Sequence, residues 1–393
     1  MIFNEALYPL FLLLSVTVFF KIPVSWRAAW LFVSGLGFYA YYADVFVLLF
    51  GLEALGVWFL MRQWRSRKDL YVLGLLIVVF VLGYYKYRNM AMLSWGNLQQ
   101  LWGSNTLPSV EALILPLAIS FFTFEFIHYM VDMRAGRIEK HSLTEYMAFI
   151  MFFPTMIAGP IKRFQGFVPQ IHQARFDWGH IYAGLSRILI GSAKKIVIAD
   201  SMDLWIAPLQ SGDLSAYEPG TLWVALFAYS IKIYVDFSGY SDIAIGSARL
   251  FGIVVPENFN WPYLRPNIAQ FWRHWHISLT TWITDYVYKS LGGSRVGFAR
   301  TLFNTILAMA VSGIWHGAAW HFMVWGLYHG LLLALHRIWR EQIKPKLPWV
   351  ETFPKLYYGL CTALTFFLVT IGWGLFIMPV ERFVKLMGRL VGL

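Results

Sequence analysis

The sequence predicts an all-α protein, a polytopic bundle of helices that lies in a membrane. Two observations lead to this prediction. Of the 393 residues, 58% are hydrophobic and only 13% are charged, whereas water-soluble domains carry about 25% charged residues. The second observation is that long apolar stretches recur along the whole chain, separated by short clusters of basic residues. The 19 tryptophans and 21 tyrosines also suit the aromatic belts that form where helices meet the membrane surface.

The apolar stretches give the expected helices in order. A helix that crosses a hydrocarbon core of about 30 Å needs about 20 apolar residues. Several stretches are shorter, so we expect tilted, re-entrant or half-membrane pieces among them and roughly nine to eleven true crossings. The stretches fall at residues 3–20, 28–43, 45–61, 70–88, 110–131, 145–159, 181–207, 220–235, 239–255, 300–316, 319–338 and 357–378.

Charges in the connecting segments predict an orientation. Basic residues lie at 21–27, 62–68 and 134–140, and cytoplasmic loops are enriched in lysine and arginine. The uncharged segment 91–108 and the acidic segment 210–219 are therefore expected outside, with the N-terminus. The second half is less regular, because the bases at 382–389 also fall outside on this alternation.

Three segments do not fit a plain spanning helix. Residues 152–163 carry two prolines and a glycine at the end of an apolar run, and proline breaks the helical hydrogen-bond ladder. We expect a re-entrant turn there. Residues 255–266 contain three prolines and are expected to form a cytoplasmic loop, and residues 267–288 mix aromatic and ionisable residues, which suits short amphipathic helices. No soluble domain is evident, so we expect one integral-membrane domain over 1–393, with a core at about 116–330.

Composition argues against several other classes of protein. The net charge of +11 does not indicate nucleic-acid binding, because the bases gather beside apolar runs as membrane loops do. The single cysteine, Cys361, excludes an intrachain disulfide and a cysteine-based metal site. The first apolar segment has acidic Glu5, rather than basic residues, at its start and no small-residue cleavage site after it, so we expect no cleavable signal peptide.

His316 is the strongest candidate for chemistry. Residues 301–315 before it carry no charge, and residues 318–320 after it stay apolar. An ionisable residue in such a setting is a functional-site hypothesis by default. Burial keeps an imidazole neutral near pH 7, and a neutral imidazole can take a proton from a hydroxyl group as a general base. Taken alone, such a histidine could equally be a hydrogen-bonded packing residue.

A second motif favours a catalytic role for His316 over a packing role. The pentapeptide Trp-His-Ile-Ser-Leu stands at 275–279, and an apolar stretch after it ends in Trp-His-Gly at 315–317. This combination resembles the membrane-bound O-acyltransferase (MBOAT) family, and most closely its bacterial branch that acetylates alginate and related polysaccharides. The resemblance implies a helical bundle that encloses a tunnel, with His316 indispensable for transfer. His276 would line the tunnel and hydrogen-bond the donor or substrate. Trp275, Trp315 and Arg273 would line the same tunnel or support the two histidines.

Further boxes support the resemblance. Residues 234–242 resemble the family's Asp-Phe-x-Gly-Tyr-Ser-Asp element, in which Asp236, Ser238 and Asp242 are expected to support the site. A structural ion pair is an equal alternative for the two aspartates, because a buried carboxylate should be paired. The candidate partners are Lys232, Arg249 and Arg273.

Residues 158–163 resemble the branch's Ala-Gly-Pro-x-x-Arg turn. Lys162 and Arg163 at its end could meet an anionic donor, or they could be ordinary boundary charges. Asn304, before His316 on the same expected helix, could orient a substrate or tie helices together. His274 and His276 form a His-x-His pair, but no carboxylate or cysteine nearby completes a ligand set, so no metal site is predicted.

The resemblance implies an O-acyltransferase of the bacterial inner membrane. It would move an acyl group, most simply acetyl, from a cytoplasmic thioester towards hydroxyl groups of an extracytoplasmic polysaccharide. The donor would be acyl-CoA or an acyl-carrier protein, with no bound cofactor, and a periplasmic esterase-like partner would complete the modification. A tetrahedral oxyanion would need hydrogen-bond donors, for which His276 or a tryptophan indole are candidates.

Other functions stay open from sequence alone. D-alanyl transfer to teichoic acid and O-acetylation of peptidoglycan are alternatives within the same family. A transporter or flippase of an acylated lipid or glycan is the alternative of another class, because broken helices and buried ionisable residues are typical of transporters too. No phosphate-binding loop, dinucleotide-binding turn or Gly-x-Ser-x-Gly elbow occurs in the sequence.

Overall fold

The computed structural model describes the chain except residues 1–4, 6, 104–108, 112, 348–351 and 393. Within these described ranges every regular element is a helix and there is no strand, which confirms the predicted all-α class. The chain divides into two compact units, residues 1–191 with 240–256 and residues 192–239 with 257–393. The expectation of a single domain stays a prediction.

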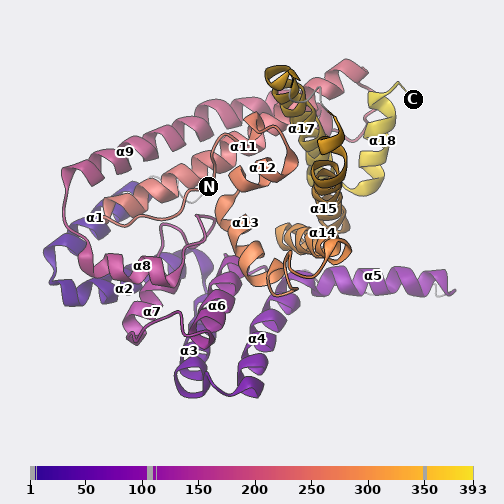
Figure 1. Cartoon of the computed structure of the whole chain (residues 1–393). Coiled ribbons are helices and arrows are strands. Elements are labelled where there is room, and N and C mark those ends of the chain that lie inside the picture. Colours follow the sequence, from indigo (N-terminus) through magenta and orange to yellow (C-terminus); the bar gives the residue numbers. More distant parts are fainter. Residues whose placement is uncertain (1–4, 6, 104–108, 112, 348–351, 393) are drawn as a thin grey trace. The chain divides into compact units, whose positions relative to one another are not determined.

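Unit 1 holds the N-terminal helices. Figure 1 shows α3, α4 and α6 alongside one another within it. The helices are α1 (Leu7–Lys21), α2 (Arg27–Ala43), α3 (Phe46–Trp64), α4 (Lys68–Leu82), α5 (Arg88–Leu101), α6 (Ile119–Arg134), α7 (Leu143–Ile150), α8 (Phe164–Gln173) and most of α9 (Trp178–Ala193).

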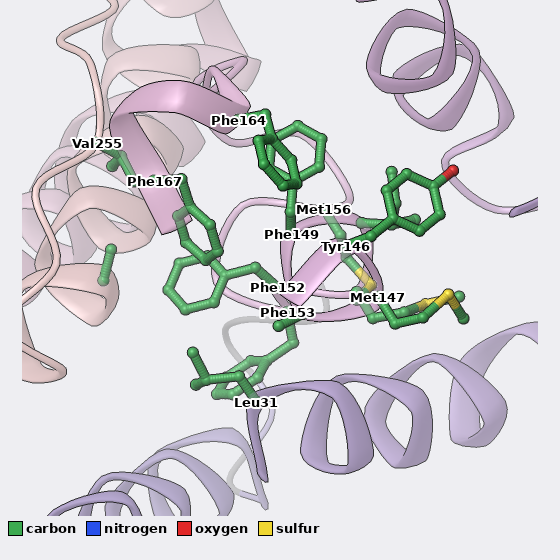
Figure 2. Packing of buried hydrophobic residues seen from close by; sticks show 14 of the residues in the cluster. Leu31, Tyr146, Met147, Phe149, Phe152, Phe153, Met156, Phe164, Phe167 and Val255 are labelled. Carbon is green, nitrogen blue, oxygen red and sulfur yellow. The ribbon is translucent and has the colours of Figure 1, made fainter. Parts of the chain in front are cut away.

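A phenylalanine-rich core holds unit 1 together. Figure 2 shows side chains from α7, from the segment after it and from α8 gathered around one centre. The ring centroids of Phe152 and Phe167 are 4.8 Å apart, and those of Phe149 and Phe164 are 5.3 Å apart. Segment 152–163, where a re-entrant turn was expected, has no helix and is almost entirely buried. This agrees with the rule that irregular backbone in a membrane protein survives where protein surrounds it.

Unit 2 holds the C-terminal helices. In the order of the chain they are α10 (Asp203–Gln210), the first two-thirds of α11 (Pro219–Leu250), α12 (Ile268–His274), α13 (Ile277–Ile283), α14 (Phe298–His316), α15 (Trp320–Ile338), α17 (Pro354–Ile377) and α18 (Val380–Leu390). Helix α15 packs against both α14 and α17 (Figure 1). Tyr328 on α15 donates its hydroxyl hydrogen bond to the Leu368 carbonyl oxygen on α17 at 2.8 Å.

Four helices in the described ranges are long and apolar enough to cross a membrane: Phe46–Trp64, Lys68–Leu101, Phe298–His316 and Pro354–Ile377. Many of the large apolar side chains on α3 and α4 point outward, for example Leu48, Leu52 and Phe80, as expected of helices that contact lipid. The estimate of nine to eleven crossings stays a prediction.

Two boundaries differ from those expected. The apolar stretches 220–235 and 239–255 belong to one continuous helix of 32 residues, α11. Asp236 and Ser238 between the two stretches interrupt the apolar run, but the helix continues through them, and Asp236 pairs with Lys195. The segment expected as an external loop from residue 91 is helical as far as Leu101, because its methionine, leucine and glutamine residues favour helix.

Candidate active site

Helix α14 carries His316 as its last residue. It packs closely on α15 through glycines: an added Cβ on Gly330 would lie 2.8 Å from the Ile306 Cα, and one on Gly313 would lie 3.0 Å from the Gly326 Cα. Small residues at such contacts let two membrane helices approach with their backbones nearly touching. The position of His316 is therefore set by backbone contact between α14 and α15.

The other end of α14 is fixed by Asn304. Its amide nitrogen donates to the carbonyl oxygens of Leu291 at 3.0 Å and Gly293 at 3.1 Å. Its amide oxygen accepts from Nε of Arg300 at 3.1 Å. Asn304 is fully buried, and its amide bonds the turn at residues 291–293 and Arg300 of its own helix. It therefore ties α14 to the preceding turn rather than to a neighbouring helix.

His276 lies at the turn between α12 and α13 in a left-handed conformation, with φ 42° and ψ 55°. Such a conformation is uncommon for residues other than glycine, and it gathers at functional sites where the surroundings enforce it. Here the surroundings are supplied by Asn258: its carbonyl oxygen accepts from the Ile277 amide at 2.9 Å, and its side-chain oxygen accepts from the Ser278 hydroxyl at 2.6 Å. Sequence reasoning missed Asn258, whose only signal was an asparagine in a proline-rich loop.

The two predicted histidines come together around Trp315. The ring centroid of Trp315 lies 4.9 Å from that of His316 and 5.9 Å from that of His276. Phe237 on α11 contacts His276 edge to face at 4.7 Å. On the other side of His316, Trp325 and Phe376 each lie 5.1 Å away, both nearly perpendicular to it. Residues 40 positions apart in the sequence thus form one aromatic site in unit 2.

The surroundings of the two histidines differ. His276 is 1% exposed, and within the described residues neither of its ring nitrogens has a hydrogen-bond partner. Burial lowers the pKa of the His276 imidazole well below its usual value, and the positive charge of a protonated His316 lowers it further. His276 is therefore neutral near pH 7. His316 is only half-buried, so its imidazole is more open to a reactant.

Trp275 belongs to the same aromatic cluster. Its ring lies 4.8 Å from Trp373 on α17 and stacks on Phe271 at 5.5 Å. Trp373 stacks in turn on Trp325 at 5.8 Å. Aromatic rings therefore connect the Trp-His-Ile-Ser-Leu turn to the residues that surround His316.

The carboxylates of the 234–242 box have partners other than those predicted. Asp236 pairs with Lys195 at 2.9 Å, and Asp242 pairs with Arg187 at 2.8 Å. The predicted partner Lys232 instead bonds Asp203, and Arg273 is exposed on α12. The expected partners were wrong because the bases come from α9 and its continuation, which lie beside α11. Ser238 bonds only within its helix, to the Val235 carbonyl oxygen.

Lys162 and Arg163 lie in unit 1. The Lys162 ammonium is 2% exposed and bonds Glu125 on α6, and it lies 4.6 Å from the centre of the Phe149 ring. Arg163 approaches Nδ1 of His128 at 3.3 Å. Lys162 is thus enclosed in a buried ion pair, and the expectation that it could meet an anionic donor is wrong for this residue.

The basic residues near the end of the chain line a pocket of about 550 Å³. It lies between residues 212–215 and α18, and its charged lining residues are Asp213, Glu381, Arg382, Lys385 and Arg389. Arg382 donates to the Ser211 carbonyl oxygen, and Arg389 donates to that of Tyr217 at 3.1 Å. These bases therefore tie α18 to the segment 211–217, which is expected outside. None of the predicted site residues lines this pocket.

No metal site emerges among the described residues, where no group of three or more histidine, cysteine, aspartate or glutamate side chains is arranged to hold an ion. Nδ1 of His274 instead meets the Gln270 carbonyl oxygen at 2.8 Å. The polar groups gathered at the site are the two imidazoles and the indole N–H of Trp315 beside them.

Comparison with known proteins assigns the chain to a family. The model of the membrane-bound O-acyltransferase family (MBOAT) matches residues 69–371. The protein named "Probable alginate O-acetylase AlgI" of Azotobacter vinelandii is 36% identical over 377 residues, which are 93% of this chain and 73% of that protein. Its counterpart in Pseudomonas aeruginosa is 35% identical over 388 residues, 96% of this chain and 72% of that protein.

A relative with a different acceptor in its name is nearly as similar. The "Peptidoglycan O-acetyltransferase" of Helicobacter pylori is 32% identical over 399 aligned residues, 93% of this chain and 73% of that protein. The predicted resemblance is confirmed by these matches and by the apolar helices. The chain belongs to the membrane-bound O-acyltransferase family and is a multi-pass membrane acyltransferase.

Proposed function

We propose that the chain moves an acetyl group from a cytoplasmic thioester towards hydroxyl groups of an extracytoplasmic polysaccharide, and that it works in the inner membrane of a bacterium. The names of the relatives, which describe acetyl transfer to alginate and to peptidoglycan, support this proposal. The observation that carries it is the His276–Trp315–His316 arrangement, in which a half-buried imidazole at a helix end lies beside a fully buried neutral one.

His316 is the proposed general base. Its unprotonated ring nitrogen takes the proton from an attacking hydroxyl group while the hydroxyl oxygen bonds the carbonyl carbon of the thioester. The carbonyl oxygen gains the negative charge, the carbon–sulfur bond then breaks, and the thiolate leaves with the proton that His316 holds. The buried ring of His276 lines the site and offers one N–H to the donor or substrate.

Arg273 is the proposed contact for the donor's phosphates. It is exposed on α12, one turn before the His276 turn, and a guanidinium binds phosphate through paired hydrogen bonds. Acetyl-CoA and an acyl-carrier protein both carry such phosphates, so either could serve as donor. An esterase-like periplasmic partner would then pass the acetyl group to the polymer.

Replacing His316 by glutamine tests the assignment. Glutamine keeps a polar side chain but cannot take a proton at neutral pH, so the rate of acetyl transfer should fall on the order of 10²–10⁴-fold, as general-base catalysis contributes. The purified chain in lipid nanodiscs is given acetyl-CoA labelled in the acetyl group, and loss of label from the donor is followed. The same replacement at exposed His172, which bonds Glu145 on the surface of unit 1, is the control and should keep the rate. A folded His316→Gln protein that transfers at the normal rate contradicts the proposal.

The acceptor is tested separately. Labelled acetyl is offered together with an unacetylated polyuronate oligosaccharide or with a peptidoglycan fragment, each with and without the candidate periplasmic partner. Label in the polyuronate supports the acceptor suggested by the Azotobacter vinelandii relative. Label only in the peptidoglycan fragment would favour the alternative suggested by the Helicobacter pylori relative.

A further inference from the structure

Three buried rings meet behind His316, and sequence reasoning assigned none of them a role. They are Trp272 on α12 and Trp325 and His329 on α15. Their ring centroids lie 5.7 Å apart for the two tryptophans, 4.9 Å for Trp325 and His329, and 5.3 Å for Trp272 and His329. Trp272 is 4% exposed and the other two are not exposed at all.

The polar atoms of all three rings lack partners. Among the described residues, neither indole N–H and neither nitrogen of His329 makes a hydrogen bond. More than about 90% of buried polar groups in proteins are hydrogen-bonded, and each one left unpaired costs about 1–3 kcal/mol. Several unpaired nitrogens on three touching rings therefore indicate a place built for a guest that accepts hydrogen bonds.

Other buried polar side chains in the same cluster do have hydrogen-bond partners. The indole N–H of Trp373 donates to the Tyr263 hydroxyl at 3.0 Å, and that hydroxyl donates to the Ser230 carbonyl oxygen at 2.7 Å. The backbone around His329 is also adapted to it, because a Cβ on Gly372 would lie 2.7 Å from Nε2 of His329. Trp272, Trp325 and His329 thus differ from Trp373 and Tyr263, whose polar atoms are paired within the same cluster.

The location of the three rings fits the acyl group. The Trp325 ring contacts the His316 ring at 5.1 Å and nearly at right angles, so a guest bound to the indole N–H lies one ring away from the proposed base. In acyl transfer the group that gains negative charge is the carbonyl oxygen, which accepts hydrogen bonds more strongly as the charge develops. Buried N–H donors act strongly there because the surroundings exclude water.

We propose that Trp325, with Trp272 and one N–H of His329, binds the carbonyl oxygen of the acyl donor and stabilises its oxyanion. This assignment rests on the proposed function and identifies the donors that its mechanism needs. The hydroxyl proton goes to His316 and the hydroxyl oxygen bonds the carbonyl carbon. The π electrons of the carbonyl move to its oxygen, held by the N–H groups. They return as the carbon–sulfur bond breaks, and the thiolate leaves with the proton.

Matched substitutions separate this role from simple packing. Trp325→Phe removes an unpaired N–H, and Trp373→Phe makes the same change in a ring whose N–H is already bonded to Tyr263. We expect Trp325→Phe to lower kcat on the order of 10²-fold, the effect of losing one oxyanion donor, with little change in KM for acetyl-CoA. Trp373→Phe should lower the thermal stability and leave kcat within about threefold of the wild type.

A change in the donor gives a second readout. A dithioester analogue of acetyl-CoA replaces the carbonyl oxygen by sulfur, which accepts hydrogen bonds weakly. The wild type should use the analogue much more slowly than acetyl-CoA, and Trp325→Phe should lose most of this discrimination because the two changes remove the same interaction. The Trp373→Phe protein should discriminate as the wild type does.

Three results would overturn the assignment. They are a folded Trp325→Phe protein with kcat within about threefold of the wild type, a pH profile shifted by that substitution with its plateau unchanged, and full discrimination against the dithioester by Trp325→Phe. The first would mean that the guest is only a structural water, and the second that Trp325 acts through His316. If His316→Gln is inactive while Trp325→Phe is fully active, this assignment fails and the proposed function stands.

Discussion

The close approach of α14 and α15 makes a strong prediction about Gly326. Replacing it by alanine would place a Cβ 3.1 Å from the Cα atoms of Ala310 and Gly313, and nearer still to the Met309 carbonyl oxygen. Carbon atoms pack at about 3.5–4.0 Å, and a backbone atom cannot move aside as a flexible side chain can. The two helices must therefore separate by roughly 0.5–1 Å at this point.

The magnitude follows from that separation. Overpacking a tight contact costs about 1–3 kcal/mol, so Gly326→Ala should lower the unfolding temperature by several degrees. His316 stands at the end of the helix that is displaced. A shift of about 1 Å in a reacting group can cost about 10²-fold in rate, so transfer should fall by roughly one to two orders of magnitude even where the protein is folded.

Thermal unfolding followed by tryptophan fluorescence and acetyl transfer from labelled acetyl-CoA measure the two effects. Gly359→Ala on α17 is the matched control, since a Cβ there would meet no atom of the described residues within 4 Å. It should be neutral or slightly stabilising, because alanine favours helix over glycine by about 1 kcal/mol. If Gly326→Ala unfolds and reacts as the wild type does, backbone contact does not position His316 and the reasoning is refuted.

Two charged groups give further predictions. Lys162→Met leaves Glu125 buried without its partner and should destabilise the chain by about 3–5 kcal/mol. The double variant Lys162→Met, Glu125→Gln should recover most of that loss in the same unfolding assay. A Lys162→Met protein as stable as the wild type would show that the ion pair contributes nothing to stability. Hydrogen bonds from Ser215 lower the pKa of Asp213, with a smaller contribution from Arg389. A lowered acid pKa stabilises the fold above the unfolded value of about 3.9 and this stability is lost as the pH falls through the folded value. Hydrogen exchange in residues 211–217, corrected for intrinsic rates, should therefore quicken below about pH 4, and Asp213→Asn should remove this pH dependence; equal acid sensitivity in both proteins would contradict the explanation.

The helices that carry the two site histidines could largely be predicted from the sequence. The uncharged run before His316 predicted a helix ending there, and the structure places it at 298–316. The aromatic and basic residues at 267–288 predicted short helices, which are α12 and α13. These predictions succeeded because they depend on local apolarity and on helix-breaking residues, which are properties of neighbouring positions.

Features that depend on distant contacts could not be predicted. The partner of Asp236 is Lys195, 41 positions earlier, and the choice among several lysines and arginines is made by how the helices lie against each other. The break expected within α11 failed for the same reason, since a paired aspartate costs the helix little. Nor does the sequence distinguish Trp373, whose N–H is bonded, from Trp325, whose N–H is not.

The left-handed backbone at His276 favours glycine at this position, whereas the proposed chemistry needs an imidazole there. Glycine adopts positive φ without the steric penalty that a Cβ brings, but it would leave a cavity where the buried imidazole packs on Phe237 and Trp315 and would remove a proposed site residue. Laboratory evolution of a sturdier biocatalyst from this scaffold should therefore hold position 276 constant and seek its gains elsewhere.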